Sequence, residues 1–353
     1  MAYTTIDNPS EHFNTVLHTG NSTDATSITG VGFQPDWVWT KCRSNTGDNF
    51  IHDSNRGAQK NLNTNDTGTE ATTSQGLQSF DSDGFTMGIL GGMNFNSQTY
   101  VNWLWKANGG TTSTNTAGTN IDTTVQANTT AGFSIMTYTG TGTDNDSIGH
   151  GLGAVPHWII VKNRDETNGW QVYHHKNTSA PETDYLNLDK QNATQDDSDR
   201  WSDQAPSSTV ITLGGNDGVS KSGVKYVCYA FTEIQGYSKF RSYIGNANAD
   251  GPFVYTGFRP AWLMLRNTIA GEDWLIWDVV RDKNNSNGNT MTGRLKANDS
   301  IAEVNGNDID FLSNGFKIRT DSGYANGDGN TILYMAFAEH PFVSSKGVPV
   351  TAR

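Results

Sequence analysis

Three stretches of this chain share one layout: GFQPDWVWTK at residues 32–41, GAVPHWIIVK at 153–162 and GFRPAWLMLR at 257–266. Each has a glycine, a proline three residues later, a tryptophan two residues after the proline, and a cation at its end. Proline fixes φ and lacks a backbone N–H donor, so it favours the start of a strand over its middle. Such repetition at intervals of roughly one hundred residues predicts three copies of one structural unit.

The residues after the proline indicate how the strand is covered. In the third copy Trp262 and Met264 alternate with Leu263 and Leu265, so both faces of the strand are apolar. Strands that are apolar on both faces are packed on both sides. This strand is therefore predicted to be central in its sheet.

Further blocks recur around these stretches in the same order. Each unit closes with an aromatic strand, at residues 100–105, 226–231 and 332–337. Asp83-Gly84 and Asn314-Gly315, flanked by aromatic residues, predict hairpin turns because both residue types accept positive φ. No segment carries a long helical repeat. We therefore expect an all-β fold of three tandem antiparallel β-sandwich repeats, lectin-like or jelly-roll-like, with very little helix.

The positions of the blocks divide the chain. The expected parts are an N-terminal segment (1–12), repeat 1 (13–107), a linker (108–131), repeat 2 (132–235), repeat 3 (236–342) and a C-terminal tail (343–353). The linker is rich in Gly, Thr and Asn, which predicts an extended or mobile joint. Almost nothing separates repeats 2 and 3, so these two should be rigidly coupled.

Composition narrows the class of protein. The chain has 353 residues with 10 Trp, 12 Tyr and 15 Phe, enough to build large cores, and a formal net charge of −12, which disfavours nucleic acid as a partner. Cys42 and Cys228 fall on predicted strands of different repeats, so two buried free thiols are expected. No apolar run approaches the ~20 residues of a membrane span, and the N-terminus resembles no secretory signal.

The sequence contains no Gly-x-Ser-x-Gly, His-Glu-x-x-His or Gly-x-x-x-x-Gly-Lys motif, so we expect no enzymatic activity, no cofactor and no metal. A pair of facing carboxylates, as in a glycosidase, stays open because sequence alone cannot pair acidic residues across a fold. His174 and His175, with His150 and His157, are the best metal candidates, but adjacent strand residues point to opposite faces. The acidic runs 144–146 and 196–199 lack the spacing of a calcium loop.

One polar pattern follows the repeats. A cation ends each proline strand, and an acidic or imidazole group lies on the following strand. We expect each cation to pair across its own sheet with that group. The cations are Lys41, Lys162 and Arg266, and the expected partners are Asp53, His174 and Asp278.

Tryptophans fall into two groups. Those that follow the repeated prolines occupy equivalent places and are predicted to form the core of each repeat, namely Pro35 and Trp37, Pro156 and Trp158, and Pro260 and Trp262. Exposed indoles can stack on sugar rings, so the tryptophans outside the pattern are the candidates for glycan contact: Trp170, Trp201 and Trp274.

The repeat resembles an uncharacterised family of virion structural, tail-fibre-like proteins of tailed marine bacteriophages. The resemblance rests on residues 28–38, 80–88, 100–110, 236–240 and 250–260, and it covers about residues 13–343. It implies a protein of the phage virion with lectin-like β-sandwiches, and it assigns no catalytic residues.

The expected function is therefore a bacteriophage virion structural protein, tail-associated or fibre-like, in contact with the host surface. A capsid decoration or head fibre is the first alternative, and a carbohydrate-binding lectin module is the second. Expected partners are other virion proteins, further copies of the chain and a host glycan, without nucleic acid or membrane insertion. The expected location is the virion, after assembly in the host cytoplasm.

Overall fold

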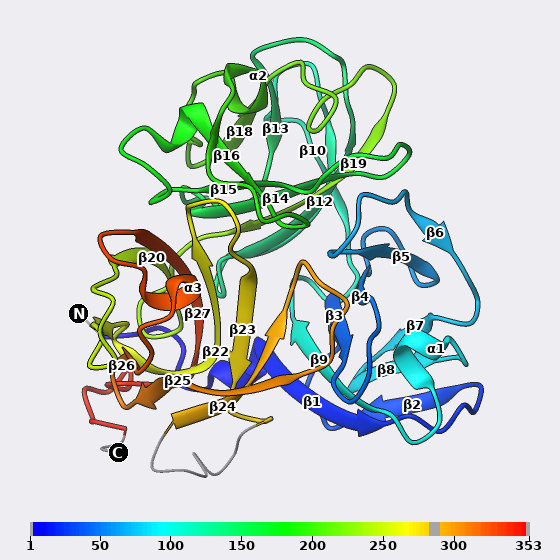
Figure 1. Ribbon diagram of the computed structural model, residues 1–353. Coiled ribbons are helices and arrows are strands. Elements are labelled where there is room, and N and C mark those ends of the chain that lie inside the picture. The colour runs from blue at the N-terminus through cyan, green and yellow to red at the C-terminus, as the bar shows by residue number, and fades with distance from the viewer. Residues whose placement is uncertain (1–2, 282–289, 351–353) are drawn as a thin grey trace.

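The computed structural model describes residues 3–281 and 290–350 and is nearly all β, with 44% strand and 5% helix (Figure 1). This confirms the predicted all-β class. The helical segments are single turns: α1 (Gly91–Asn94), α2 (Ser198–Trp201), α3 (Gly323–Asn326), and the 3-10 turns η1 (Pro9–Glu11) and η2 (Pro181–Thr183).

Three main sheets repeat one order of strands. In each sheet, the closing strand of the unit lies between the opening strand and the proline strand. The next two strands along the chain follow on the other side of the proline strand. The first unit has β1 (Phe13–Thr19), β9 (Thr99–Trp105), β3 (Trp37–Cys42), β4 (Asn49–Asp53) and β5 (Lys60–Asn63), with β6 (Ala71–Thr72) at the edge.

The second and third units follow the same plan. The second has β12 (Phe133–Thr139), β19 (Lys225–Phe231), β14 (Trp158–Asn163), β15 (Gln171–His174) and β16 (Asp184–Asn187), flanked by β10 (Ser113–Asn115), β11 (Thr123–Asn128) and β17 (Gln195–Asp196). The third has β20 (Ser238–Ile244), β27 (Thr331–Pro341), β22 (Phe258–Asn267), β23 (Trp274–Asp278) and β24 (Thr290–Lys296).

A second layer of strands covers the outer face of each main sheet. Each pair of layers encloses its own hydrophobic core, so every unit has an outer core of its own. The outer layers of the first two units are separate sheets: β2 (Thr26–Thr29), β8 (Gly84–Met87) and β7 (Leu77–Asp81), and β13 (Asp146–Gly149) and β18 (Val210–Leu213). In the third unit the main sheet continues from β24 into β25 (Val304–Leu312), β26 (Gly315–Ile318) and β21 (Phe253–Tyr255), which pack over β22.

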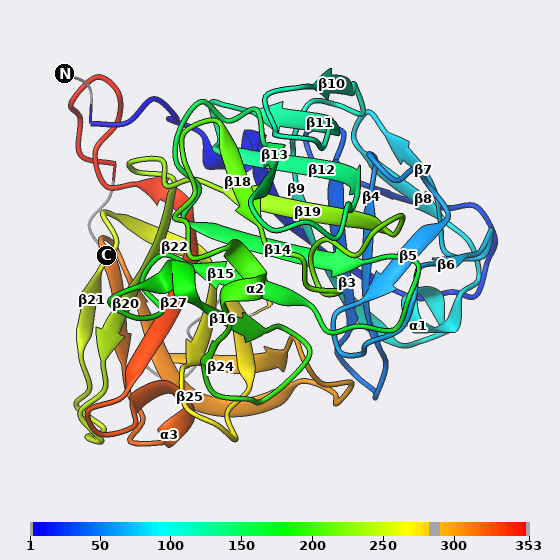
Figure 2. The same ribbon diagram turned by 90° about the horizontal axis from the view of Figure 1, so that it is seen from above.

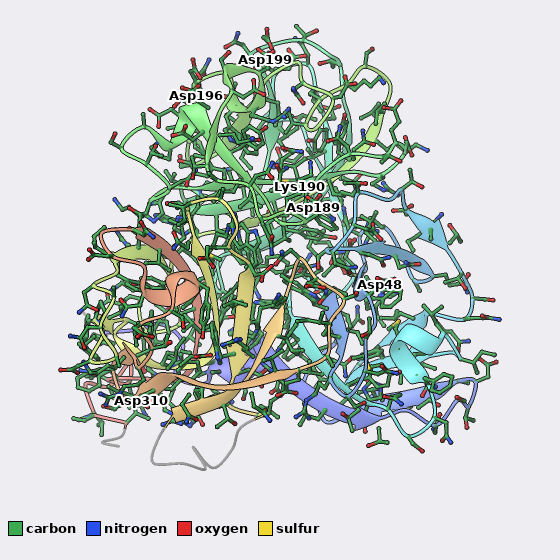
Figure 3. All side chains as sticks on the ribbon, in the orientation of Figure 1. Asp48, Asp189, Lys190, Asp196, Asp199 and Asp310 are labelled. Atoms are coloured by element: carbon green, nitrogen blue, oxygen red, sulfur yellow. The ribbon has the colours of Figure 1, made fainter. Side chains whose placement is uncertain are left out.

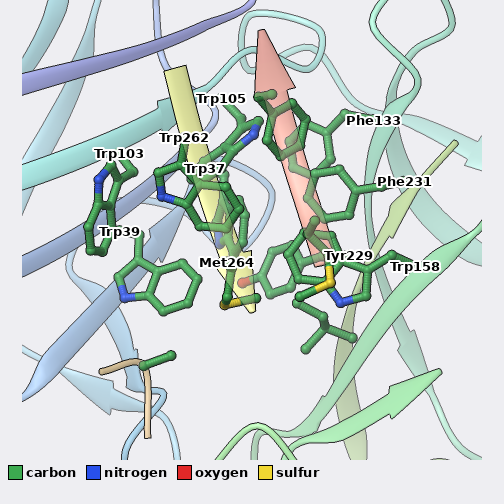
Figure 4. Packing of buried hydrophobic residues seen from close by; sticks show 14 of the residues in the cluster. Trp37, Trp39, Trp103, Trp105, Phe133, Trp158, Tyr229, Phe231, Trp262 and Met264 are labelled. Carbon is green, nitrogen blue, oxygen red and sulfur yellow. The ribbon is translucent and has the colours of Figure 1, made fainter. Parts of the chain in front are cut away.

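The inner faces of the three main sheets meet in a fourth core at the centre of the molecule (Figures 1, 2 and 4). Trp37, Trp158 and Trp262 are fully buried and all belong to this one cluster. Aromatic ring contacts join every pair of units, with centroid distances of 4.8 Å for Trp37–Tyr229, 5.6 Å for Trp105–Trp262 and 5.9 Å for Phe231–Phe337. The units are therefore three lobes of a single packed body.

The proline strands are covered on both faces, as predicted. In β22, Trp262 and Met264 point into the central core, whereas Leu263 and Leu265 point into the outer core of the third unit. The prediction that proline begins the strand is wrong for Pro260. It lies inside β22, at a register shift against β27, because a bulge accommodates a residue that cannot donate to the ladder.

The two predicted hairpins are present, and Gly84 adopts the predicted positive φ, 144°. Both glycines also lie close to a neighbouring strand. Asp81 pairs with Gly84 in β7–β8, and Leu312 pairs with Gly315 in β25–β26. A Cβ on Gly84 would lie 1.9 Å from the carbonyl oxygen of Ile28 in the adjacent strand, and a Cβ on Gly315 would lie 2.1 Å from that of Val254. Any larger residue would push the strands apart.

The prediction of a linker at 108–131 is wrong, because the segment contains β10 and β11 and extends the sheet of the second unit. Val125 pairs with Met136 of β12 and packs into the outer core. The start of the segment is also fixed: the buried carboxylate of Asp36 accepts hydrogen bonds from the backbone N–H of Gly109 at 2.8 Å and of Gly110 at 2.7 Å. The segment is therefore an ordered connection and not the mobile joint that was predicted.

The two ends of the chain lie together. Within the tail, Val343 forms a bridge with Pro349, and the backbone N–H of Ser345 donates to the Asp7 carboxylate at 2.6 Å. The expected N-terminal segment and C-terminal tail therefore contact each other, although residues 1–2 and 351–353 lie outside the described part.

Candidate functional site

The three cations that end the proline strands hold neighbouring units together. The expected pairing with Asp53, His174 and Asp278 is wrong, because the antiparallel register places those groups opposite Trp37, Trp158 and Trp262 at the other end of the strand. Instead each cation donates to a carbonyl oxygen of the neighbouring unit. Lys41 binds Asp299 at 3.0 Å, Lys162 binds Thr67 at 3.2 Å, and Arg266 binds Asn192.

Two of the three proposed glycan contacts belong to the same boundaries between units. Trp170 donates its indole N–H to the Asn63 carbonyl at 2.8 Å, and Trp274 donates to the Asn187 carbonyl at 2.8 Å. Both indoles are fully buried, and Trp201 is 1% exposed and bound to the Asp184 carbonyl. These three tryptophans offer no exposed ring to a sugar, so the glycan assignment to them is wrong.

A charged network crosses the boundary between the first and second units. The buried Asp53 carboxylate binds the Arg56 guanidinium and accepts the Tyr229 hydroxyl of the second unit at 2.6 Å. Glu70 lies between Arg56, at 3.1 Å, and Arg164 of the second unit, at 2.8 Å. These contacts hold the pKa of Glu70 below its ordinary value although burial opposes the charged form.

The boundary between the third and first units repeats this network with equivalent residues. Asp278 binds Arg281 at 2.5 Å and accepts the Trp103 indole N–H of the first unit at 2.9 Å. Glu303 then lies between Arg281, at 3.3 Å, and Arg43 of the first unit, at 2.5 Å.

At the boundary between the second and third units, neutral side chains take the place of the buried acid and its arginine, and charge is found elsewhere on the boundary, in the Arg241–Glu233 pair. His174 stands where Asp53 and Asp278 stand, and Asn177, three residues later, replaces the arginine. Asn177 accepts a hydrogen bond from Thr194 at 2.6 Å, and the backbone N–H of Thr194 donates to Thr268 of the third unit at 2.9 Å. Burial lowers the pKa of His174 well below its usual value, so this imidazole is neutral.

Two of the histidines predicted as metal candidates lie close together, but both form hydrogen bonds to the backbone. The His157 and His175 rings are 4.5 Å apart, yet His157 accepts the backbone N–H of Glu233 and His175 binds the Phe240 carbonyl at 2.5 Å. In the part of the chain that the structure describes, no three His, Cys, Asp or Glu side chains gather to hold a metal ion. Cys42 and Cys228 are buried and free.

The acidic run 196–199 lies at the outer rim of the second unit (Figure 3). Asp196 and Asp199 are exposed there, and Asp197 accepts the backbone N–H of Asp199 to cap α2. This loop is accounted for by local structure.

The candidate binding site is an aromatic and charged groove where the N-terminal segment and the end of the second unit meet the third unit. We name it the tyrosine groove and define it by Tyr3, Glu233, Lys239, Arg241, Phe253 and Tyr255. It consists of two adjoining hollows of about 340 and 470 Å³, which share Lys239, Arg241 and Tyr255. Both volumes fall in the range of small-ligand sites, ~300–1,000 Å³.

Strand alternation positions the aromatic rings of the tyrosine groove. In β21 the Val254 side chain is 7% exposed and enters the outer core, so its neighbours must face away from it. Phe253 and Tyr255 are accordingly 46% and 49% exposed. The N-terminal Tyr3 adds a third ring, and its hydroxyl donates to the Gly257 carbonyl at 2.7 Å.

The charged side of the tyrosine groove lies on β20 and the turn before it. Arg241 binds Glu233 through two parallel hydrogen bonds of 2.8 and 2.7 Å, and the Phe240 backbone N–H fixes the same carboxylate. Lys239 donates to the Tyr255 carbonyl at 3.3 Å and lies 5.2 Å from the ring centroid. Burial lowers the pKa of Lys239, and Arg241 lowers it further, while Glu233 partly offsets both effects.

Sequence reasoning missed the tyrosine groove. The alternation Phe253-Val254-Tyr255 was a readable signal for two rings on one face of a strand. Nothing in the sequence indicated that Tyr3 would reach Gly257, more than 250 positions away, because that contact depends on how the units assemble.

Three sheets of one strand order around a shared centre define the class of this molecule, a single-chain, three-lobed all-β protein. The chain belongs to the family described as a domain of unknown function (DUF7483), whose model matches residues 8–341 and so spans all three lobes. Comparisons with curated proteins and with solved structures give no match. In the described ranges 3–281 and 290–350, no helix is long and apolar enough to cross a membrane.

Proposed function

We propose that this chain is a non-enzymatic structural component of a tailed-phage virion, tail-associated or fibre-like. The phage assignment rests on the resemblance of residues 28–38, 80–88 and 100–110 to virion proteins. The observation that supports a structural role is the shared central core, since the lobes cannot move apart without exposing buried tryptophans. A rigid block with fixed outer faces suits repeated assembly with other virion proteins and with further copies of the chain.

The buried charges fit a structural role. Asp53 and Asp278 are each held by an arginine and by a donor from the neighbouring unit, which leaves them occupied rather than open to a substrate. Separation of the lobes would remove the donors from Tyr229 and Trp103 that these buried carboxylates accept.

Labelling of purified particles tests the proposal. Intact particles are purified from lysates of infected cells and labelled with an antibody against the folded chain. Electron microscopy is expected to show the antibody on the tail or its fibres. Labelling of the head would favour the capsid decoration instead. Particles that lack the chain altogether would contradict a virion role.

A further inference from the structure

We infer that the tyrosine groove binds a carbohydrate that carries an acidic group, such as a uronic acid. The inference goes beyond the proposed function, because it concerns the isolated chain and holds wherever the protein is located. Three independent features of the groove carry it: its exposed rings, its local charge and its fixed polar side chains.

The exposed rings suit the apolar face of a sugar. Phe253 and Tyr255 leave about half of their surface open, whereas the tryptophans of the repeats are buried in the cores. Two residues apart on one strand, the two rings lie side by side on the same face, roughly 7 Å apart along the strand. Aromatic rings with a polar edge, like that of tyrosine, offer both a stacking surface and a hydroxyl.

The local charge favours an anion. Glu233 is bound by both arms of Arg241, so this pair is internally neutralised. No carboxylate of the described residues forms an ion pair with Lys239, which leaves one cation in excess in a chain whose net charge is −12. A carboxylate on the ligand would supply the missing partner.

The polar side chains of the groove are held in place before any ligand arrives. Arg241 is fixed by Glu233, Glu233 is fixed by the Phe240 backbone, and Tyr3 is fixed by Gly257. Side chains that are already ordered lose little entropy on binding. A contrasting hollow of about 490 Å³ over β10 and β11 is lined by Asn, Ser, Thr, Ala, Val and Gly, without aromatic or charged side chains.

A glycan array with acidic and neutral oligosaccharides, probed with the full chain, tests this inference. We expect acidic glycans to be bound, with the affinity for the best of them measured by calorimetry. Tyr255→Ala and Lys239→Ala are each expected to weaken that binding more than tenfold, and Lys239→Arg to retain most of it. Phe95→Ala is the matched control, because Phe95 is a 57% exposed aromatic residue on the first unit.

Each outcome of this experiment decides the question. Failure of the folded chain to bind any acidic glycan, or equal binding by all the variants, would overturn the inference. Loss of self-association in the Tyr255 and Lys239 variants, without glycan binding by the parent chain, would assign the groove to contact between copies. Far-ultraviolet circular dichroism of each variant checks that it folds. These results are independent of whether the chain is found in particles.

Discussion

Tyr229 shows how one residue links two units. Its hydroxyl donates to the buried Asp53 carboxylate across the boundary, at 2.6 Å. Hydrogen bonds to charged groups contribute about 1.5–3 kcal/mol, so Tyr229→Phe is expected to lower the free energy of unfolding by that amount. Urea denaturation measures the change. Tyr173→Phe is the control, since that hydroxyl makes no hydrogen bond to described residues, and an equal loss in both variants would contradict the assigned role.

The His174 position should reject a buried charge that the equivalent positions Asp53 and Asp278 accept. His174→Asp would place a carboxylate where Asn177 and Met335 replace the arginine and the indole or hydroxyl donor of the other boundaries. An unpaired buried charge costs about 3–5 kcal/mol, and thermal unfolding should show a loss of that size. Adding Asn177→Arg is expected to restore part of the stability. Full tolerance of His174→Asp alone would show that the position is not equivalent to Asp53.

At the scale of elements, Asp36 fixes the connection from the first unit to the second. Its carboxylate accepts the backbone N–H groups of Ala107, Gly109 and Gly110 and the Ser54 hydroxyl. Asp36→Ala leaves these donors unpaired, at a cost of about 1–3 kcal/mol for each one that stays buried. We expect limited proteolysis to cut this variant near residue 110 faster than the parent chain. Equal cleavage rates would contradict the role of Asp36.

The sequence predicted the strands better than their assembly. The apolar alternation at Trp262–Leu265 correctly indicated a strand covered twice, because period two is a local property. The same pattern could not reveal that the Trp262 face of this strand is buried against the first unit, because that contact depends on how the units assemble. The cations at Lys41 and Lys162 were misassigned for that reason, since their partners belong to a neighbouring unit.

Burial of neutral histidines makes the whole molecule sensitive to acid. Burial lowers the pKa of His52 to about 3 and that of His150 to about 4. Below the unfolded pKa of about 6.5 the unfolded chain takes up protons that the folded chain does not, so stability is complete above that pH and falls as the pH drops towards 4. At pH 5 each such histidine contributes a loss of about 2 kcal/mol.

His52→Phe tests this pH dependence, because aromatic residues occupy the equivalent positions Tyr173 and Trp277. Urea unfolding between pH 7 and pH 4.5 is expected to show a smaller decline in the variant than in the parent chain. Identical slopes for both proteins would exclude His52 as a source of the acid sensitivity.

At the scale of the whole molecule, the central claim is that three lobes share one core. Scanning calorimetry of the intact chain measures this most directly, through the ratio of the calorimetric to the van't Hoff enthalpy of unfolding. One cooperative transition with a ratio near one is the predicted result, since Trp37, Trp158 and Trp262 must be exposed together. Two or three separate transitions, or a ratio near three, would contradict the shared core.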